Sequence, residues 1–225
     1  KNKLAKYYFE KAIETSEKSE NTSNEGFFNI LAKAYDKLGN YSKADSLFCL
    51  SISFSEKSEP DNSLAFANTC LNYGTFYKEQ KKFDKAEKYY KLAYTIYSKN
   101  SGNYNSNSIV ALNDLGDLYL LKGNSENALQ FFQLALHAQQ ENIDSADIYQ
   151  NPSNKHLLAD ADLLFSVRGK AKAFYLRSKS GLNNTADLKH ALVAYELAVN
   201  IIDKLSIYYG RSDNTSALAQ KENQT

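Results

Sequence analysis

Apolar side chains recur along this chain at the spacing of one helix face. Within residues 27–38 they fall three or four positions apart, which places them on a single stripe of an amphipathic helix. They are Phe28, Leu31, Ala32, Tyr35 and Leu38. Gly39 follows at once, and a glycine directly after the last periodic residue typically ends a helix. The pattern therefore predicts a helix over 27–38 with a tight turn behind it.

A second apolar stripe begins directly after this turn. Its members are Tyr41, Ala44, Leu47, Phe48 and Ile52. A polar stretch over 57–62, which contains Pro60, then closes the unit. Two helices joined by a tight turn form an αα-hairpin, and we expect this hairpin to be the building unit of the fold.

The hairpin pattern repeats with a period of 42 residues. Three segments, 31–35, 73–77 and 115–119, align without a gap, and each ends in a tyrosine. Later in the sequence after each tyrosine, three matching positions carry an alanine, an aromatic residue and a small residue. These are Ala44, Phe48 and Ser51; Ala86, Tyr90 and Ala93; and Ala128, Phe132 and Ala135. A fixed period of this length is the signature of a repeat array, so we expect three hairpins over 24–142. Their later helices are expected at 71–80, 83–98, 109–122 and 126–142.

Small residues at matching places explain how paired helices could approach each other. Ala32, Gly74 and Gly116 lie in the first helix of each hairpin, opposite the repeated alanine of the second helix. Aromatic side chains are expected to fill the rest of the core. The two cysteines, Cys49 and Cys70, lie inside expected helices and are predicted to be reduced core thiols.

Both ends of the chain depart from this period. Residues 1–17 match only a second helix, so we expect the remainder of a truncated repeat there. Near the other end, Ala191, Tyr195 and Ala198 match the third hairpin after 63 residues instead of 42. The added length predicts an irregular connector, a hairpin of long helices and a polar tail, at 143–156, 157–209 and 210–225.

The repeated positions resemble the tetratricopeptide repeat, abbreviated TPR. The matching residues of the best copy are Leu115, Gly116, Tyr119, Gly123, Ala128, Phe132 and Ala135. The 42-residue period is similar to the extended-helix variant found in kinesin light chains. The resemblance implies an all-α fold, a right-handed α-solenoid (superhelix) of TPR-like helix-turn-helix hairpins. It also implies binding of proteins rather than catalysis.

The last hairpin resembles the segment that precedes the caspase-like protease domain of bacterial TPR-CHAT proteins. The residues that carry this resemblance are 151–152, 157–158, 163–164, 169–171, 187–198, 201–205 and 211–213. It implies that the chain is the regulatory region of a bacterial cysteine peptidase whose catalytic domain follows residue 225. No catalytic role passes to a residue of this chain.

Composition narrows the remaining function classes. The chain has 225 residues, a net charge of +1 and no methionine, and we expect it to be part of a longer protein. It lacks the basic excess that drives binding to phosphate backbones and the run of about 18 apolar residues that spans a membrane. No signal peptide is recognisable. We therefore expect a cytoplasmic protein that binds neither nucleic acid nor membrane.

Side chains with catalytic or metal-binding potential are scattered. A metal site needs three or four converging ligands. The three histidines lie instead in separate segments: His137 in the third hairpin, His156 in the irregular connector and His190 in the last hairpin. Neither cysteine forms a Cys-x-x-Cys pair, and no glycine-rich phosphate loop is present. We predict no catalytic residue, no cofactor and no metal, and hence no enzyme activity of this chain.

The expected partner site is the concave face of the repeat array, which first helices line. Residues rotated away from the packing stripe point into this groove. The candidates are Asn29, Lys33, Asn72, Thr75, Lys78, Asn113 and Asp117. Asparagines there could bond to an extended peptide, and Lys33 and Lys78 could take an acidic group. The set differs from the carboxylate clamp that reads chaperone C-termini.

Two functions remain open at this point. The first is a non-catalytic scaffold that senses a protein or peptide partner, or the downstream protease domain itself, for a CHAT protease. The alternative is the TPR sensor of a histidine kinase or a transcription regulator. The domain encoded after residue 225 distinguishes them.

Overall fold

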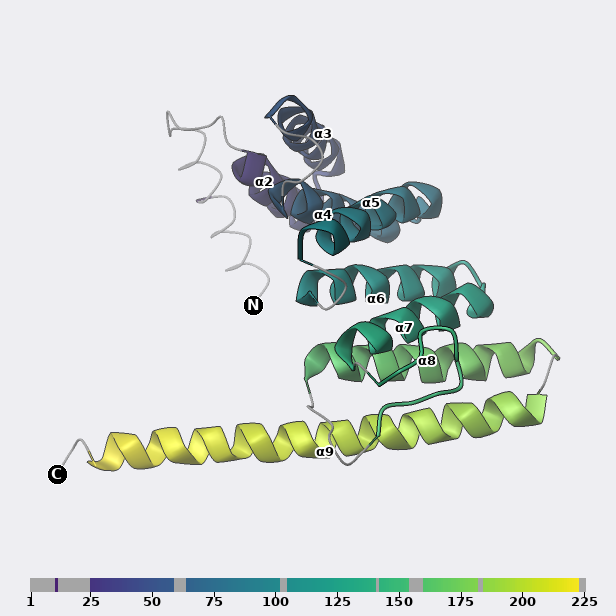
Figure 1. The fold of residues 1–225 in the computed structure, drawn as a ribbon. Coiled ribbons are helices and arrows are strands. Elements are labelled where there is room, and N and C mark those ends of the chain that lie inside the picture. Colours follow the sequence, from purple (N-terminus) through teal and green to yellow (C-terminus); the bar gives the residue numbers. More distant parts are fainter. Residues whose placement is uncertain are drawn as a thin grey trace. The chain divides into compact units, whose positions relative to one another are not determined.

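A computed structural model describes residues 25–58, 64–101, 105–140, 142–153, 160–181 and 184–222, together with Lys11. Within these residues the chain is all-α, with no strand (Figure 1), which confirms the predicted fold class. The helix expected over 1–17 lies outside the described residues, apart from Lys11. The chain forms two compact units, residues 1–114 and 115–225, which are described separately.

The first unit consists of helix-turn-helix hairpins. Its helices are α2 (Glu25–Lys37), α3 (Tyr41–Ser58), α4 (Leu64–Glu79), α5 (Phe83–Ser101) and the beginning of α6 (Ser106–Leu121). α2 packs on α3 and α4, and α4 also packs on α3 and α5. α4 begins seven residues before the predicted residue 71. The added turns bury Phe66, Ala67 and Cys70, so they belong to the same apolar face.

The turns within the first three hairpins share one geometry. Gly39, Lys81 and Gly123 have φ angles of +77°, +57° and +74°. The next residue donates its backbone N–H to the carbonyl five positions back, as in Asn40 to Tyr35 at 2.9 Å. This is the Schellman motif, which normally places glycine in the left-handed conformation. The structure therefore confirms the predicted turns and shows a lysine taking the glycine position in the second one.

The core of the first unit is aromatic, as predicted. Tyr73, Tyr90 and Tyr97 are at most 1 % exposed. A Cβ atom at Gly74 would lie 2.7 Å from Cδ1 of Tyr90, so this glycine allows α4 and α5 to approach. Cys70 is buried, but Cys49 is exposed, and the prediction of a core thiol was wrong there. Cys49 lies at the edge of its helix stripe, directly after the buried Phe48.

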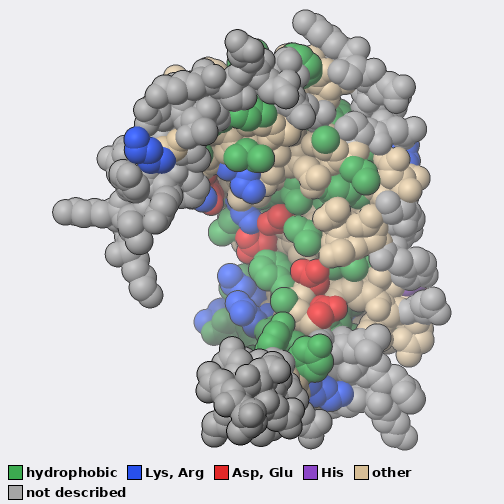
Figure 2. Space-filling view, turned by 90° about the vertical axis from the view of Figure 1, so that its left-hand side faces the viewer, with side chains coloured by type: hydrophobic (Ala, Val, Ile, Leu, Met, Phe, Trp, Pro, Cys, Tyr) green, Lys and Arg blue, Asp and Glu red, His purple; other side chains and the backbone are tan. Residues whose placement is uncertain are grey.

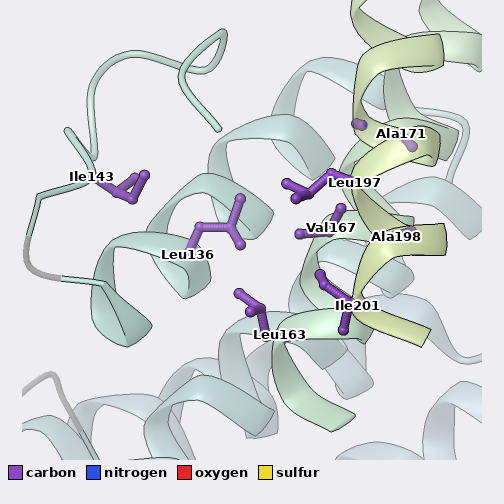
Figure 3. Packing of buried hydrophobic residues seen from close by; sticks show 9 residues of the cluster. Leu136, Ile143, Leu163, Val167, Ala171, Leu197, Ala198 and Ile201 are labelled. Atoms are coloured by element: carbon purple, nitrogen blue, oxygen red, sulfur yellow. The ribbon is translucent and has the colours of Figure 1, made fainter. Parts of the chain in front are cut away.

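The second unit comprises the rest of α6, α7 (Ser125–Gln139), the irregular connector, α8 (Ala161–Lys179) and α9 (Asn184–Glu222). Figure 3 shows its main apolar cluster, to which α7, the connector, α8 and α9 all contribute. The labelled members are Leu136, Ile143, Leu163, Val167, Ala171, Leu197, Ala198 and Ile201. One continuous core thus holds the last hairpin against α7.

The boundaries of the last hairpin differ from those expected. α8 begins at Ala161, where the Asp160 carboxylate caps it by accepting the N–H of Leu163 at 2.7 Å, and the expected beginning at residue 157 lies outside the described residues. α9 continues through Gly210 to Glu222, where a polar tail was expected. A glycine inside a helix costs only about 1 kcal/mol relative to alanine and ends the helix only when it turns left-handed.

A buried lysine ties the connector to α7 and α8. Lys170 has no exposed surface, and its Nζ donates to Oε1 of Gln133 at 2.7 Å and to the carbonyl of Gln150 at 2.5 Å. Gln133 in turn donates to the carbonyl of Asp144 at 2.6 Å. Burial lowers the pKa of Lys170 to about 7, although the charge of Asp147 acts in the opposite direction.

Because the pKa of Lys170 is lowered in the folded chain, we expect the free energy of unfolding to rise as the pH increases from 7 to 9. An unfolded lysine titrates near 10.5, so between about pH 7 and 10 the unfolded chain holds the additional proton. The slope is at most about 1.4 kcal/mol per pH unit for one proton. Denaturant titrations at pH 7 and pH 9 measure the effect, and Lys170→Met should be nearly independent of pH. An equal slope in the variant would contradict this assignment.

Candidate partner-binding site

In the first unit, three of the sequence-predicted residues, Asn29, Asn72 and Lys78, make polar contacts between neighbouring hairpins. Asn72 of α4 donates through Nδ2 to Oδ1 of Asn29 on α2 at 3.1 Å, and Asn29 is only 8 % exposed. Lys78 of α4 lies 2.9 Å from Oδ1 of Asp114 on α6, and their side chains are 16 % and 20 % exposed. These contacts link successive first helices, so a partner that uses Lys78 has to compete with Asp114.

The other candidates of this unit differ in exposure. Thr75 is half-buried, and its hydroxyl accepts a hydrogen bond from Tyr90 at 3.1 Å. Burial raises the pKa of Tyr90, which keeps this phenol protonated as the donor. Asn113 is 4 % exposed, whereas Lys33 is exposed. Of the predicted set in this unit, Lys33 thus offers the most accessible charged group.

The second unit contains a pocket of about 220 Å³ in which the seventh candidate, Asp117, takes part. Side chains from α6, α7, α8 and α9 line it. They are Asp117, Leu120, Phe132, Phe165, Arg168, Gly169, Lys172 and Tyr195. The pocket combines two cationic groups, one carboxylate and three aromatic rings.

Arg168 and Lys172 give the pocket its charge. They lie four residues apart on α8, which places them on one helix face, and both are exposed. Neither side chain makes a hydrogen bond or ion pair with the described part of the chain. Burial raises the pKa of Tyr195, an effect that the Arg168 cation partly opposes, so the phenol remains a neutral hydrogen-bond donor.

Gly169, which has no side chain, lines this pocket together with Phe132. The ring of Phe132 is fully buried, and a Cβ atom at Gly169 would lie 2.3 Å from its Cε1 and Cζ atoms. A Cβ atom at Gly116 of α6 would lie 2.8 Å from the same two ring atoms. The two glycines therefore let α6 and α8 close around one aromatic ring.

Sequence reasoning missed Arg168, Lys172, Phe165 and Tyr195. The usable signal was the spacing of Arg168 and Lys172 on a first helix, alternating with the buried Val167 and Ala171. The outward-facing positions were aligned only in the 42-residue repeats. The 63-residue step removed α8 from that alignment.

The two histidines among the described residues have structural contacts. His190 stacks on Phe174 at a centroid distance of 5.3 Å, and Nδ1 of His137 lies 2.5 Å from the carbonyl of Ile143. His156 lies outside the described residues. Among the described residues, no group of three or more His, Cys, Asp or Glu side chains could hold a metal ion.

The described surface is mixed in character. Figure 2 shows basic, acidic and hydrophobic side chains together on one side of the molecule. None of the described helices is both long enough and apolar enough to cross a membrane. Recognition is therefore better sought in local arrangements, such as the pocket, than in a large field of one sign.

Comparison with known proteins identifies the repeats. Residues 26–58 and residues 65–141 each match the tetratricopeptide repeat family. The chain is similar to the crystal structure of BtubC (BKLC) from P. vanneervenii, with a TM-score of 0.69 and 20% identity, over 91% of this chain and 74% of that one. Two structures of nearly identical TPR-like repeats, from a Podosopora anserina protein assigned as a kinesin light chain, give TM-scores of 0.67 and 0.66. Both have 14% identity and cover 91% of this chain and 88% of theirs. A comparison with curated proteins gives no match. The chain thus has an all-α TPR-like solenoid fold and carries tetratricopeptide repeats over residues 26–58 and 65–141.

Proposed function

We propose that this chain is a protein-interaction scaffold that binds an acidic segment of a protein partner at the pocket of the second unit. TPR folds generally bind protein partners, and the pocket supplies the chemistry for a particular kind of segment. The observation that carries the proposal is the pair Arg168 and Lys172, two exposed cations that make no ion pair within the described residues.

The groups around these cations favour a carboxylate next to an apolar side chain. An arginine can bind a carboxylate through two parallel hydrogen bonds, and such charge-assisted bonds are stronger than neutral ones. Phe165 and Tyr195 offer ring surface for the neighbouring apolar group. At about 220 Å³ the pocket is smaller than the roughly 300–1,000 Å³ typical of small-molecule sites, so one peptide side chain fits it better than a cofactor.

Binding to an immobilised array of short peptides tests this proposal. We expect the chain to select peptides that contain glutamate or aspartate beside a large apolar residue. The variant Arg168→Ala/Lys172→Ala should bind them at least about tenfold more weakly, since each lost charged hydrogen bond is worth about 1.5–3 kcal/mol. Lys179→Ala is the matched control, because Lys179 is exposed on the same helix and lies over the Tyr175 ring, outside the pocket.

The outcome can also reject the proposal. Selection of basic or purely apolar peptides would contradict it, as would equal affinity of the double variant and the Lys179→Ala control. Added salt should weaken binding of the selected peptides, because it screens exposed ion pairs.

We also propose that the scaffold is the sensor of a larger bacterial protein with a CHAT protease as its output. The support is the resemblance carried by residues 187–198 and the neighbouring segments of the last hairpin. The alternative output is a histidine kinase or a transcription regulator. Sequencing the coding region beyond residue 225 distinguishes these outputs. In a protein with a protease domain, Arg168→Ala/Lys172→Ala should abolish partner-dependent peptidase activity, whereas the Lys179→Ala control should keep it.

A further inference from the structure

The outward face of α9 carries an exposed apolar stripe that the last hairpin does not use. Its members are Leu188, Leu192, Tyr195, Val199 and Ile202, with exposed fractions between 39 and 59 %. They are spaced four, three, four and three residues apart. This is the heptad spacing of the contact seam between two supercoiled helices.

A different face of α9 makes the core of its own hairpin. Ala191, Ala194, Ala198 and Ile201 are at most 3 % exposed, and α9 packs with this face on α8. The stripe therefore adds a second apolar surface to the same helix. Figure 1 shows α9 continuing well past the beginning of α8, so α8 accompanies only part of its length.

The length and continuity of the stripe indicate that another protein surface covers it. From residue 188 to residue 202 a helix rises about 21 Å at 1.5 Å per residue. Single exposed apolar residues are common, but a contiguous apolar surface of this kind usually marks an interface. The seam spacing indicates that another helix covers it.

Charges along one edge of the stripe indicate which helix that is. Lys189, Glu196 and Asp203 are exposed and follow one another at intervals of seven residues. In an antiparallel pair of α9 helices, Lys189 of each copy lies opposite Asp203 of the other, and Glu196 lies at the two-fold axis beside Glu196 of the other copy. The two Lys–Asp pairs outnumber the one like-charge contact. In a parallel pair this edge would face the other edge of the seam, where Ala191 and Ala198 are buried against α8, so no opposite charges would meet.

We propose that α9 pairs with α9 of a second copy of this chain, antiparallel and around a two-fold axis. Such an interface uses the same surface of both copies, and it is therefore closed at two subunits. The inference rests on α9 and not on the proposed peptide binding, although Tyr195 belongs both to the stripe and to the pocket.

Sedimentation of the full 225-residue chain over a range of concentrations tests the pairing. We expect a monomer–dimer equilibrium, and Leu192→Glu/Val199→Glu should raise the dissociation constant at least about a hundredfold, because four apolar contacts per dimer are lost. Val193→Glu is the matched control. Val193 is 50 % exposed and adjacent to Leu192, but it lies outside the seam. The dissociation constant of the Val193→Glu dimer should therefore stay within about threefold of that of the original chain.

The charge pattern allows a second test. Lys189→Glu should weaken the dimer, whereas Lys189→Glu combined with Glu196→Lys and Asp203→Lys should restore it, because the edge remains complementary to itself. Circular dichroism should show folded helices in every variant, since all substituted side chains are exposed. A chain that stays monomeric at all concentrations would overturn the proposal and assign the stripe to another element. Equal dimerisation of the Leu192→Glu/Val199→Glu variant would overturn it too.

Discussion

Replacement of Arg177 by methionine is expected to lower the free energy of unfolding of the second unit by about 3–5 kcal/mol. Arg177 lies near the end of α8 and makes two hydrogen bonds to the Asp187 carboxylate at the beginning of α9, at 2.8 and 2.6 Å. It also reaches Glu126 of α7 at 2.8 Å and the Tyr149 hydroxyl of the connector at 3.3 Å. One guanidinium therefore joins four segments.

The size of this effect follows from the burial of Asp187. Its side chain is 1 % exposed, so methionine at position 177 leaves a buried carboxylate without its counter-ion. The cost of an uncompensated buried charge exceeds the net stabilisation that the intact pair provides. Removing both charges with Arg177→Met/Asp187→Leu should therefore recover most of the loss. Arg177→Lys should fall between, since a lysine keeps the charge but not the planar fork.

The contact with Glu126 provides a control for this prediction. The Glu126 side chain is 59 % exposed, and Glu126→Gln should cost no more than about 1 kcal/mol. The chain contains no tryptophan whose fluorescence could report unfolding. Denaturant unfolding can instead be followed by the circular dichroism signal of the helices. A loss below about 1 kcal/mol in Arg177→Met, or an additive loss in the double variant, would contradict the proposed role of this ion pair.

The fold was largely predictable because packing residues recur at fixed positions. Ala44, Ala86 and Ala128 are all fully buried, as the repeat predicted. Gly74 and Gly116, which were expected opposite these alanines, instead make room for the rings of Tyr90 and Phe132. What the pattern could not give was where a helix ends when no breaker intervenes. α4 begins at Leu64 for this reason, and α9 passes through Gly210 because a glycine that keeps the helical conformation does not end a helix.

The polar interior was less accessible to sequence reasoning. Lys170 stands between Gly169 and Ala171 and would ordinarily be assigned to the surface. Its burial depends on Gln133 and on the carbonyl of Gln150, and the irregular connector brings the latter into place. No periodic signal predicts such a partner.

The candidate pocket was only partly predictable for the same reason. Asp117 could be identified from the 42-residue alignment, whereas Arg168, Lys172 and Tyr195 belong to the hairpin behind the connector. Their meeting requires the close approach of α8 to the Phe132 ring. That approach depends on Gly169, which can be tested directly.

Gly169→Ala is expected to destabilise the second unit by about 2 kcal/mol. The added methyl group would lie 2.3 Å from two carbons of the Phe132 ring, which is fully buried and already in contact with Gly116. Overpacking of this kind typically costs about 1–3 kcal/mol. The better helix propensity of alanine returns at most about 1 kcal/mol. Denaturant unfolding measures the net effect.

Two further variants separate this clash from a general effect of substitution in α8. Gly116→Ala should cost less, because its methyl group would stay 2.8 Å from the same ring. Gly169→Ala combined with Phe132→Leu should cost less than the sum of the two single changes, since contacting residues are energetically coupled. Additive losses would mean that the ring does not limit the approach of α8. Because Phe132 and Gly169 both line the pocket, Gly169→Ala should also weaken binding of the acidic peptides under conditions where the variant is fully folded.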